Sequence, residues 1–201
     1  MLDAEVAHGP EPHSLWFCPR ERGVVYLKCP PQSGGYRPVS EGEKPKVVIR
    51  NARKEELPQL AEVYLSAYEG MEHYAYYDYE EAVDYMEWLY RGHKDGFFVA
   101  EVDGKPVGFV ACNPFWRDRF VGRTCEIHEL AVAKEWKGRG LGRALMRRAL
   151  DYGREKGCRT ASLWVGEGNT LAIGWYRRLG FKQAGRWGIW IRMRKNLLEE
   201  P

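Results

Sequence analysis

Three glycines at alternate positions, Gly138, Gly140 and Gly142, separate an apolar segment at residues 124–133 from a long amphipathic stretch that ends near residue 156. The apolar segment predicts a strand, and the amphipathic stretch predicts a helix. Without Cβ atoms, successive backbone N–H groups of such a loop can approach one ligand, and the start of the helix adds a partial positive charge. The loop therefore either binds a phosphate or pyrophosphate or simply makes a tight turn.

The residues that follow these glycines exclude two common phosphate-binding loops. A nucleotide-hydrolysing P-loop requires Lys and then Ser or Thr after its last glycine, where this chain has Arg143 and Ala144. A dinucleotide-binding loop requires Gly-x-Gly-x-x-Gly, and its last glycine would again fall at Arg143. Arg139 and Arg143 lie within the turn of the loop, where their charge can support phosphate binding.

Proline is distributed unevenly along the 201 residues, because seven of the eleven prolines precede residue 46. Proline disfavours long helices, so residues 1–45 are expected to form a Pro-rich arm. Within the arm, two apolar runs at residues 15–18 and 24–29 flank a glycine-containing segment. These runs predict a short β-hairpin.

The remaining chain has regular apolar patterns that alternate between strand and helix periods. It is expected to form one domain at residues 46–195, followed by a tail at 196–201. Asp103-Gly104 predicts a tight hairpin turn, because both positions accept positive φ. The order of the segments predicts a mixed α/β (α+β) fold. Besides the helix after the glycine loop, helices are expected at 55–68, 80–90 and 169–179, and strands at 47–49, 96–102, 105–111, 124–133, 160–165 and, in two parts, 181–193.

Net charge is small, since 31 Lys and Arg residues against 28 Asp and Glu residues leave +3. A dedicated nucleic-acid-binding protein carries more concentrated basic charge, so nucleic acid is not an expected partner. The apolar runs fall short of the ~20 residues that cross a bilayer, and the N-terminus lacks the basic flank and apolar stretch of a signal peptide. The chain is therefore expected to be cytoplasmic and to have no membrane partner.

The five cysteines are odd in number and scattered, unlike the dense even set of a disulfide-stapled secreted domain. Cys112, Cys125 and Cys158 are expected to be small core residues with reduced thiols. The arm offers four potential zinc ligands but no Cys-x-x-Cys pair, so no metal is expected, with zinc binding by the arm as the less favoured alternative. These four residues are His8, His13, Cys18 and Cys29.

Two segments together resemble the GCN5-related N-acetyltransferase (GNAT) superfamily. The family's pyrophosphate signature is Arg or Gln, two residues, Gly, one residue, then Gly or Ala, and this chain has Lys137-Gly138-Arg139-Gly140-Leu141-Gly142. The segment from Asn169 through Trp175-Tyr176 to Leu179-Gly180-Phe181 is similar to the family's Asn-x-x-Ala-x-x-Phe-Tyr and Leu-Gly-Phe. The resemblance covers residues 46–193. It implies a mostly antiparallel, twisted mixed sheet with helices on both faces and splayed central strands.

The resemblance implies an enzyme that moves an acetyl group from acetyl-CoA to a primary amine by direct attack. Lys137 replaces the family's Arg or Gln, which keeps a charge but loses planar bidentate geometry. A non-catalytic acyl-CoA-binding sensor or interaction module on the same fold is the alternative, and a homodimer is compatible with either. The residues implied in cofactor binding are Leu130, Ala131, Val132, Lys137, Gly138, Arg139, Gly140, Leu141, Gly142, Arg143, Asn169 and Tyr176.

Three residues carry the implied chemistry. Tyr176 stands where many family members have a phenol close to the CoA sulfur, so it is predicted to be the general acid. Glu129 is the first prediction for the general base and Glu126 the second, on the strand that also carries His128. In a regular strand the two carboxylates would face opposite sides, so a bulge is required for both to reach the site. Ion pairing of the glutamates and packing of Tyr176 are the alternatives.

The region of the first two expected helices, at the end of their connection and the start of the second helix, is rich in tyrosines and acids. Such side chains could hold a cationic amine by cation–π contact and charge, although half of them are expected to serve ordinary packing. The segment favours a positively charged acceptor, which would be a protein N-terminus, a lysine, a polyamine or a small amine. Its residues are Tyr74, Tyr76, Tyr77, Asp78, Tyr79, Glu80 and Glu81.

Overall fold

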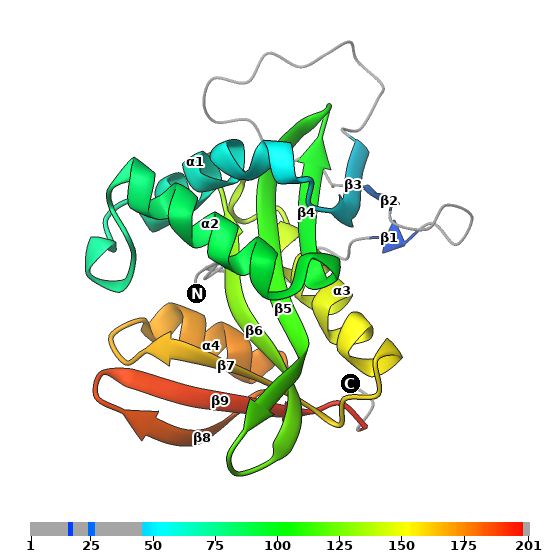
Figure 1. Cartoon of the computed structure of the whole chain (residues 1–201), viewed down its shortest axis with the longest axis vertical. Coiled ribbons are helices and arrows are strands. Elements are labelled where there is room, and N and C mark those ends of the chain that lie inside the picture. The colour runs from blue at the N-terminus through cyan, green and yellow to red at the C-terminus, as the bar shows by residue number, and fades with distance from the viewer. Residues whose placement is uncertain (1–15, 18–23, 27–45, 199–201) are drawn as a thin grey trace.

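The computed structural model describes residues 16–17, 24–26 and 46–198 (Figure 1). Its helices are α1 (Leu57–Tyr68), α2 (Tyr79–His93), α3 (Leu141–Glu155) and α4 (Thr170–Arg178). Its strands are β1 (Trp16–Phe17), β2 (Val24–Tyr26), β3 (Lys46–Asn51), β4 (Phe97–Val102), β5 (Lys105–Asp118), β6 (Gly122–Val132), β7 (Thr160–Gly166), β8 (Lys182–Trp187) and β9 (Trp190–Asn196).

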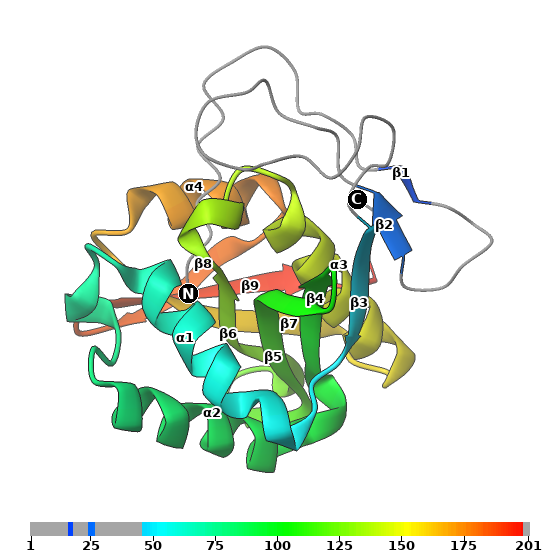
Figure 2. The same ribbon diagram turned by 90° about the horizontal axis from the view of Figure 1, so that it is seen from above.

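The described strands form a single nine-stranded sheet in the order β1-β2-β3-β4-β5-β6-β7-β9-β8. Neighbouring strands run antiparallel except for β6 and β7, which run parallel. Figures 1 and 2 show α1 and α2 together against one face of the sheet and α3 against the other. The mixed, mostly antiparallel α/β fold with helices on both faces is therefore confirmed.

The hairpin expected in the arm is confirmed, because β1 and β2 pair antiparallel with Trp16 opposite Tyr26. Sequence reasoning did not foresee that β2 also pairs with β3, which joins the hairpin to the sheet. The four potential zinc ligands of the arm lie outside the described residues. The boundary of the domain near residue 46 stays a prediction.

Strand β5 is longer than its pattern predicted. The turn at Asp103 and Gly104 is confirmed, with φ of 49° and 79°. Beyond it, the strand was expected to end at residue 111 but continues to Asp118. Pro114 cannot donate to a ladder, and the register shifts between Asn113 and Trp116 so that pairing with β6 resumes beyond it. The prediction was wrong because a bulge absorbs the proline.

Two hydrophobic clusters lie on the two faces of the sheet. One joins the sheet to α3 and α4, and it holds Cys112, Cys125 and Cys158, as expected for core thiols. The other joins the sheet to α1 and α2. Strand β6 contributes to both, with Leu130 in the first cluster and Ala131 in the second. Because both faces of β6 are covered, its polar side chains must find partners inside the protein.

Strands β6 and β7 separate partway along their length. They pair at Cys125 with Ala161, Glu126 with Ser162 and Ile127 with Leu163. Beyond Ile127, β6 continues along β5 only, while β7 continues along β9. The expected splay of the central strands is therefore confirmed. In the part of the chain that the structure describes, no helix has the length and apolarity needed to span a membrane.

Candidate active site

Glu126 and Glu129 can both reach the site only if β6 contains a bulge, and the structure has this bulge. Ala111 pairs with Glu129 and Cys112 with Ile127, so His128 is the extra residue. Residues 126 and 128 share one face by strand alternation, and the bulge turns residue 129 to that same face. The contacts agree with this, because the His128 ring lies 5.3 Å from the Trp88 ring of α2. The face of β6 toward α2 thus carries both glutamates and the histidine.

Glu129 is 2% exposed and lies among tyrosines. Its Oε1 accepts hydrogen bonds from the Tyr68 hydroxyl and from its neighbour Leu130 N, both at 3.1 Å. Its Oε2 accepts from the Tyr85 hydroxyl at 3.1 Å. These donors replace the water that burial removes from the carboxylate. They come from α1 and α2, so both helices must be docked before the site exists.

Burial and the charge of Glu129 alter the acidity of the surrounding phenols. Burial raises the pKa of Tyr64, Tyr68 and Tyr85, and the carboxylate of Glu129 raises each pKa further. Tyr176 adds a smaller effect on Tyr68, which places the two phenols near each other. All three phenols therefore keep their protons at neutral pH and act as hydrogen-bond donors.

Sequence reasoning missed Tyr64, Tyr68 and Tyr85. It singled out the tyrosines of residues 74–79 instead. The signal that could have found the first two is their i, i+4 spacing on one face of a helix that must cover the predicted active strand. Their rings lie 4.6 Å apart between centroids.

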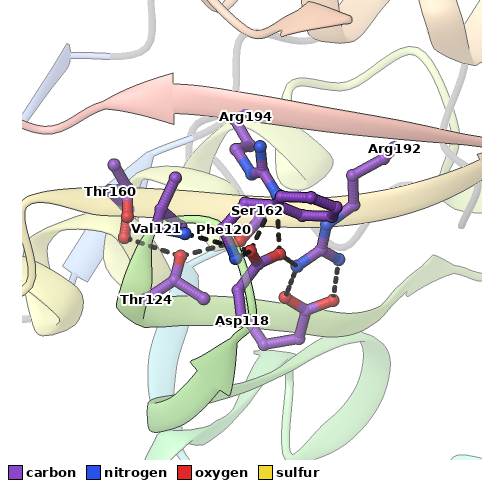
Figure 3. Close-up of polar contacts among 9 residues, drawn as sticks. Asp118, Phe120, Val121, Thr124, Thr160, Ser162, Arg192 and Arg194 are labelled. Carbon is purple, nitrogen blue, oxygen red and sulfur yellow. Dashed lines mark hydrogen bonds and ion pairs between the residues drawn. The ribbon is translucent and has the colours of Figure 1, made fainter. Parts of the chain in front are cut away.

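Glu126 occupies a different environment, although it is equally buried at 3% exposure. The guanidinium of Arg192, on β9, donates to both of its carboxylate oxygens. The same guanidinium reaches Asp118 Oδ2 at 3.0 Å, and Arg194 donates to Asp118 at 2.8 Å (Figure 3). Burial raises the pKa of Glu126, and Arg192 opposes that effect. Glu126 is thus one end of an ion-pair network that joins the β5–β6 hairpin to β9.

Asp118 also shapes the tip of that hairpin. Its carboxylate accepts from Phe120 N at 2.8 Å and Val121 N at 3.2 Å. Although burial opposes it, hydrogen bonds from Arg194 and Phe120, with those of Arg192 and Val121, hold the pKa of Asp118 well below its usual range. The hydroxyls of Thr124 and Ser162 lie 2.7 Å apart beside the network and link β6 to β7 (Figure 3). The polar side chains at this end of β6 therefore hold neighbouring strands together.

His128 stands between these environments. Burial, and to a smaller extent the positive charge of Arg192, lower its pKa to about 4. At neutral pH the ring is therefore neutral.

Tyr176 and Asn169 come from α4. Tyr176 is 1% exposed and contacts the rings of Trp175 and Phe181. The side-chain oxygen of Asn169 caps α4 by accepting from Ala172 N at 3.0 Å. The side-chain amide nitrogen of Asn169 is the group that can donate a hydrogen bond to a ligand. The cap follows from the preference of asparagine for helix starts.

The glycine loop has the backbone angles that its sequence requires. Gly138 and Gly140 have φ of 75° and 86°, in the left-handed region that side chains disfavour. A Cβ at Gly138 would meet no atom within 4 Å, so the surface above this residue is open. Gly140 is the N-cap of α3 and provides no side-chain cap, so the first-turn N–H groups of Leu141 and Gly142 point out of the helix start.

The charged residues of the loop are placed unequally. Lys137 donates from Nζ to the carbonyl of Ala67 at 2.7 Å, which ties the loop to the last turn of α1. The Arg139 guanidinium lies 4.7 Å from the centre of the Trp136 ring. Arg143 is exposed beside the helix start. The two arginines are therefore better placed than Lys137 to add charge at a bound phosphate.

The tyrosine-rich and acid-rich segment is divided between structure and surface. Asp78 caps α2 by accepting from Glu80 N and Glu81 N. The Tyr74 hydroxyl accepts from Gly168 N at 3.1 Å, and its ring fills the space where a Cβ of Gly166 would lie. Tyr76, Tyr77, Tyr79, Glu80 and Glu81 are exposed. Tyr74 and Asp78 thus serve the fold, and the side chains of the other five lie at the surface.

Comparison with known proteins identifies the family. The model of the acetyltransferase (GNAT) family matches residues 57–181. An uncharacterised N-acetyltransferase of Methanocaldococcus jannaschii is 43% identical over 150 residues, which cover 74% of this chain and 66% of that relative.

Solved structures agree. The crystal structure of PH1933 from Pyrococcus horikoshii has a TM-score of 0.69 and 40% identity, covering 75% of this chain and 98% of that one. The PaiA N-acetyltransferase of Thermoplasma acidophilum, solved in complex with coenzyme A, shares the fold with a TM-score of 0.60 at 21% identity, covering 75% and 98%. The resemblance found in the sequence, to a family of enzymes that use acetyl-CoA, is confirmed. The chain belongs to the acetyltransferase (GNAT) family.

Proposed function

We propose that this chain transfers an acetyl group from acetyl-CoA to a primary amine. The observation that carries the proposal is the position of Glu129. Its carboxylate lies on the half of β6 that has parted from β7, and Tyr68 and Tyr85 donate hydrogen bonds to it at 3.1 Å. A buried carboxylate at the opening between two strands can accept a proton from an amine that enters there.

The residues around the splay fit acetyl-CoA, which would supply the acetyl group as an activated thioester. The open surface above Gly138 and the start of α3 suit its pyrophosphate, with Arg139 and Arg143 adding charge. The edge of β6 at Leu130, Ala131 and Val132 faces the gap left by β7, where an extended pantetheine arm can pair as a strand does. We expect the side-chain amide of Asn169, at the start of α4, to contact the pantetheine from the other side.

Two side chains move the protons. Glu129 accepts a proton from the amine as the amine attacks the thioester carbonyl. The Tyr176 hydroxyl donates a proton to the departing thiolate. Glu126 is held by Arg192 on both carboxylate oxygens, so it positions strands and is not the base.

The attack is direct, without an acetyl-enzyme. A covalent route needs an activated nucleophile, such as a cysteine with a lowered pKa. The three cysteines of the described residues are buried. A hydrogen bond with Cys112 and then burial raise the pKa of Cys125, and burial raises that of Cys158. Neither thiol is activated for acyl transfer.

The acceptor is a primary amine of a peptide, a protein or a small molecule. The proposal is tested by release of CoA thiol from acetyl-CoA in a panel of such amines, including peptides with free and blocked N-termini. We expect free amines to be acetylated and blocked ones not. Tyr176→Phe should lower turnover about tenfold or more, the usual contribution of a general acid.

The alternative, a non-catalytic sensor of acyl-CoA, is decided by the same experiment. Calorimetric binding of acetyl-CoA without release of thiol in any amine would support the sensor and overturn the enzyme. Absence of acetyl-CoA binding would overturn both. Unchanged turnover in Tyr176→Phe would remove only the assignment of the general acid.

A further inference from the structure

A pocket of about 410 Å³ lies between the second half of α2 and the β5–β6 hairpin. It is distinct from the glycine loop and from the splay of β6 and β7. Trp88, Arg91 and Gly92 contribute from α2, Asn113 and Trp116 from β5, and His128 from β6. None of these residues has a role in the function proposed above.

Three rings give the pocket its shape. The Trp88 and His128 ring centres lie 5.3 Å apart at 85°, and those of Trp116 and His128 lie 4.9 Å apart at 83°. Both indole planes are therefore nearly perpendicular to the imidazole plane, so the two indoles form the sides of the pocket and the imidazole forms its floor. The indoles are 48% and 40% exposed, although such large rings are usually buried. Exposed aromatic surface with a few polar groups at its border is typical of a ligand site.

Gly92 keeps the pocket open. It lies within α2, where glycine is less favourable than alanine. Its φ is not in the left-handed region, and a Cβ there would meet no atom within 4 Å. Neither the backbone nor the packing of the described residues therefore requires glycine at this position. Its missing side chain leaves room above Trp88, one helical turn earlier.

The charge of the lining selects the kind of ligand. A cage for an ammonium ion would gain from carboxylates, but the lining contains none and includes the guanidinium of Arg91. Asn113 uses its side-chain oxygen to accept from Phe115 N at 2.9 Å, which leaves its amide nitrogen as a donor. The imidazole of His128 is neutral at pH 7. A flat ring that carries a carboxylate complements this lining.

Two stacked rings, Trp88 and Tyr85, connect the pocket to Glu129. Trp88 stacks on Tyr85, with ring centres 5.9 Å apart and planes 13° apart. The hydroxyl of Tyr85 in turn donates to Glu129 Oε2. His128, the floor of the pocket, directly precedes Glu129 in the bulge. A ring held between Trp88 and Trp116 would thus place an attached amine on the side of β6 that carries Glu129.

We propose that this pocket binds a planar aromatic ring of the acceptor, with an acidic group of that ring directed to Arg91 and Asn113. The inference rests on the proposed function and narrows its acceptors to amines linked to an aromatic acid. It differs from the cationic acceptor that the sequence favoured, because the charges lining this pocket are of the opposite kind.

The test uses three matched amines: 4-(2-aminoethyl)benzoate, the corresponding benzamide, and the analogue with a saturated cyclohexane ring. We expect kcat/KM for the benzoate to exceed that for the saturated analogue about tenfold and that for the benzamide about fivefold. Gly92→Leu, which fills the pocket, should reduce both ratios to near one. Arg91→Gln should reduce only the benzoate-to-benzamide ratio. Because each ratio is formed within one variant, a general loss of activity cancels.

Glu87→Leu is the matched control, since it adds the same side chain to an exposed position of α2 outside the pocket lining. It should keep both ratios of the unchanged protein. Ratios near one in the unchanged protein, or ratios that survive Gly92→Leu, would overturn the inference.

A binding measurement separates this inference from the proposed function. The probe is 4-ethylbenzoate, which has the ring and the acid but no amine to acetylate. It should quench tryptophan fluorescence of the full chain, and the quenching should be lost in Gly92→Leu but kept in Glu87→Leu. Quenching without acetylation of any amine would support the pocket and refute the transferase. Acetylation without quenching or ring preference would refute the pocket alone.

Discussion

The two halves of β6 differ in their neighbours, and this difference separates two glutamates that the sequence places three residues apart. In the first half, Glu126 lies on backbone that pairs with β5 on one side and β7 on the other. In the second half, Glu129 lies on backbone that pairs with β5 alone. Both carboxylates are almost fully buried, at 3% and 2% exposure. Burial alone therefore does not distinguish the carboxylate that is ion-paired across strands from the one proposed as the general base.

The partners distinguish them. Arg192 binds both carboxylate oxygens of Glu126 with a permanent positive charge, so this carboxylate is already occupied by a cation of the protein itself. Glu129, in contrast, accepts hydrogen bonds from the neutral hydroxyls of Tyr68 and Tyr85. An amine that becomes positive during attack would be stabilised by the second carboxylate and not by the first. Three experiments can break or sharpen this contrast.

The largest effect is expected at Arg192. Arg192→Met should lower the free energy of unfolding by about 3–5 kcal/mol, because it leaves Glu126 and part of Asp118 buried without their cation. Urea denaturation measures the change. The double variant with Glu126→Leu should be less destabilised than Arg192→Met, since it removes the stranded charge as well. A loss below about 1 kcal/mol in the single variant would show that the network does not hold the hairpin to β9.

Next in size is the loss of the proposed general base. Glu129→Gln should lower kcat about 100-fold, equal to roughly 2.7 kcal/mol, because an amide cannot accept the proton. The control is Glu126→Gln, which should act mainly on stability and retain more activity per folded molecule. Steady-state kinetics of both, normalised to the folded fraction, makes the comparison. If Glu126→Gln loses more activity than Glu129→Gln, the two roles must be exchanged.

The smallest effect is the pH dependence that His128 imposes on stability. The unfolded chain binds a proton at this residue near pH 6.5, whereas the folded chain binds it only near its pKa of about 4. Between these values the unfolded state holds more protons, so the free energy of unfolding should fall as the pH falls from 6.5 to 4. We expect about 2 kcal/mol across this window, measured by urea denaturation at several pH values.

His128→Gln supplies the comparison for that slope. Glutamine does not titrate, so the variant should lose about 2 kcal/mol less than the unchanged protein between pH 6.5 and pH 4. The carboxylates that titrate in the lower part of this window are common to both proteins and cancel in the difference. Equal slopes would mean that the ring takes up its proton at the same pH in the folded and unfolded protein, so that the pocket beside β6 would become charged as the pH falls through about 6.5.

Several features could be predicted from the sequence because their causes are local. The glycine loop and the turn at Asp103-Gly104 each depend on the backbone preferences of one or two residues. The sequence could state that β6 needs a bulge if Glu126 and Glu129 are both to reach the site, because two residues at odd spacing in a regular strand do not share a face. The length of β5 could not, because the bulge that absorbs Pro114 forms only against β6.

The sequence by itself determined the family, the strand–loop–helix unit and the candidates for acid and base. These signals lie within short windows, where period, capping and turn chemistry act. Tertiary structure decided which glutamate contacts tyrosines and which contacts an arginine, because the two tyrosines are 61 and 44 residues away along the chain and the arginine is 66 residues away. It also decided that two tryptophans and a histidine enclose one pocket. Contacts of that range arise from packing of whole elements, and no local pattern records them.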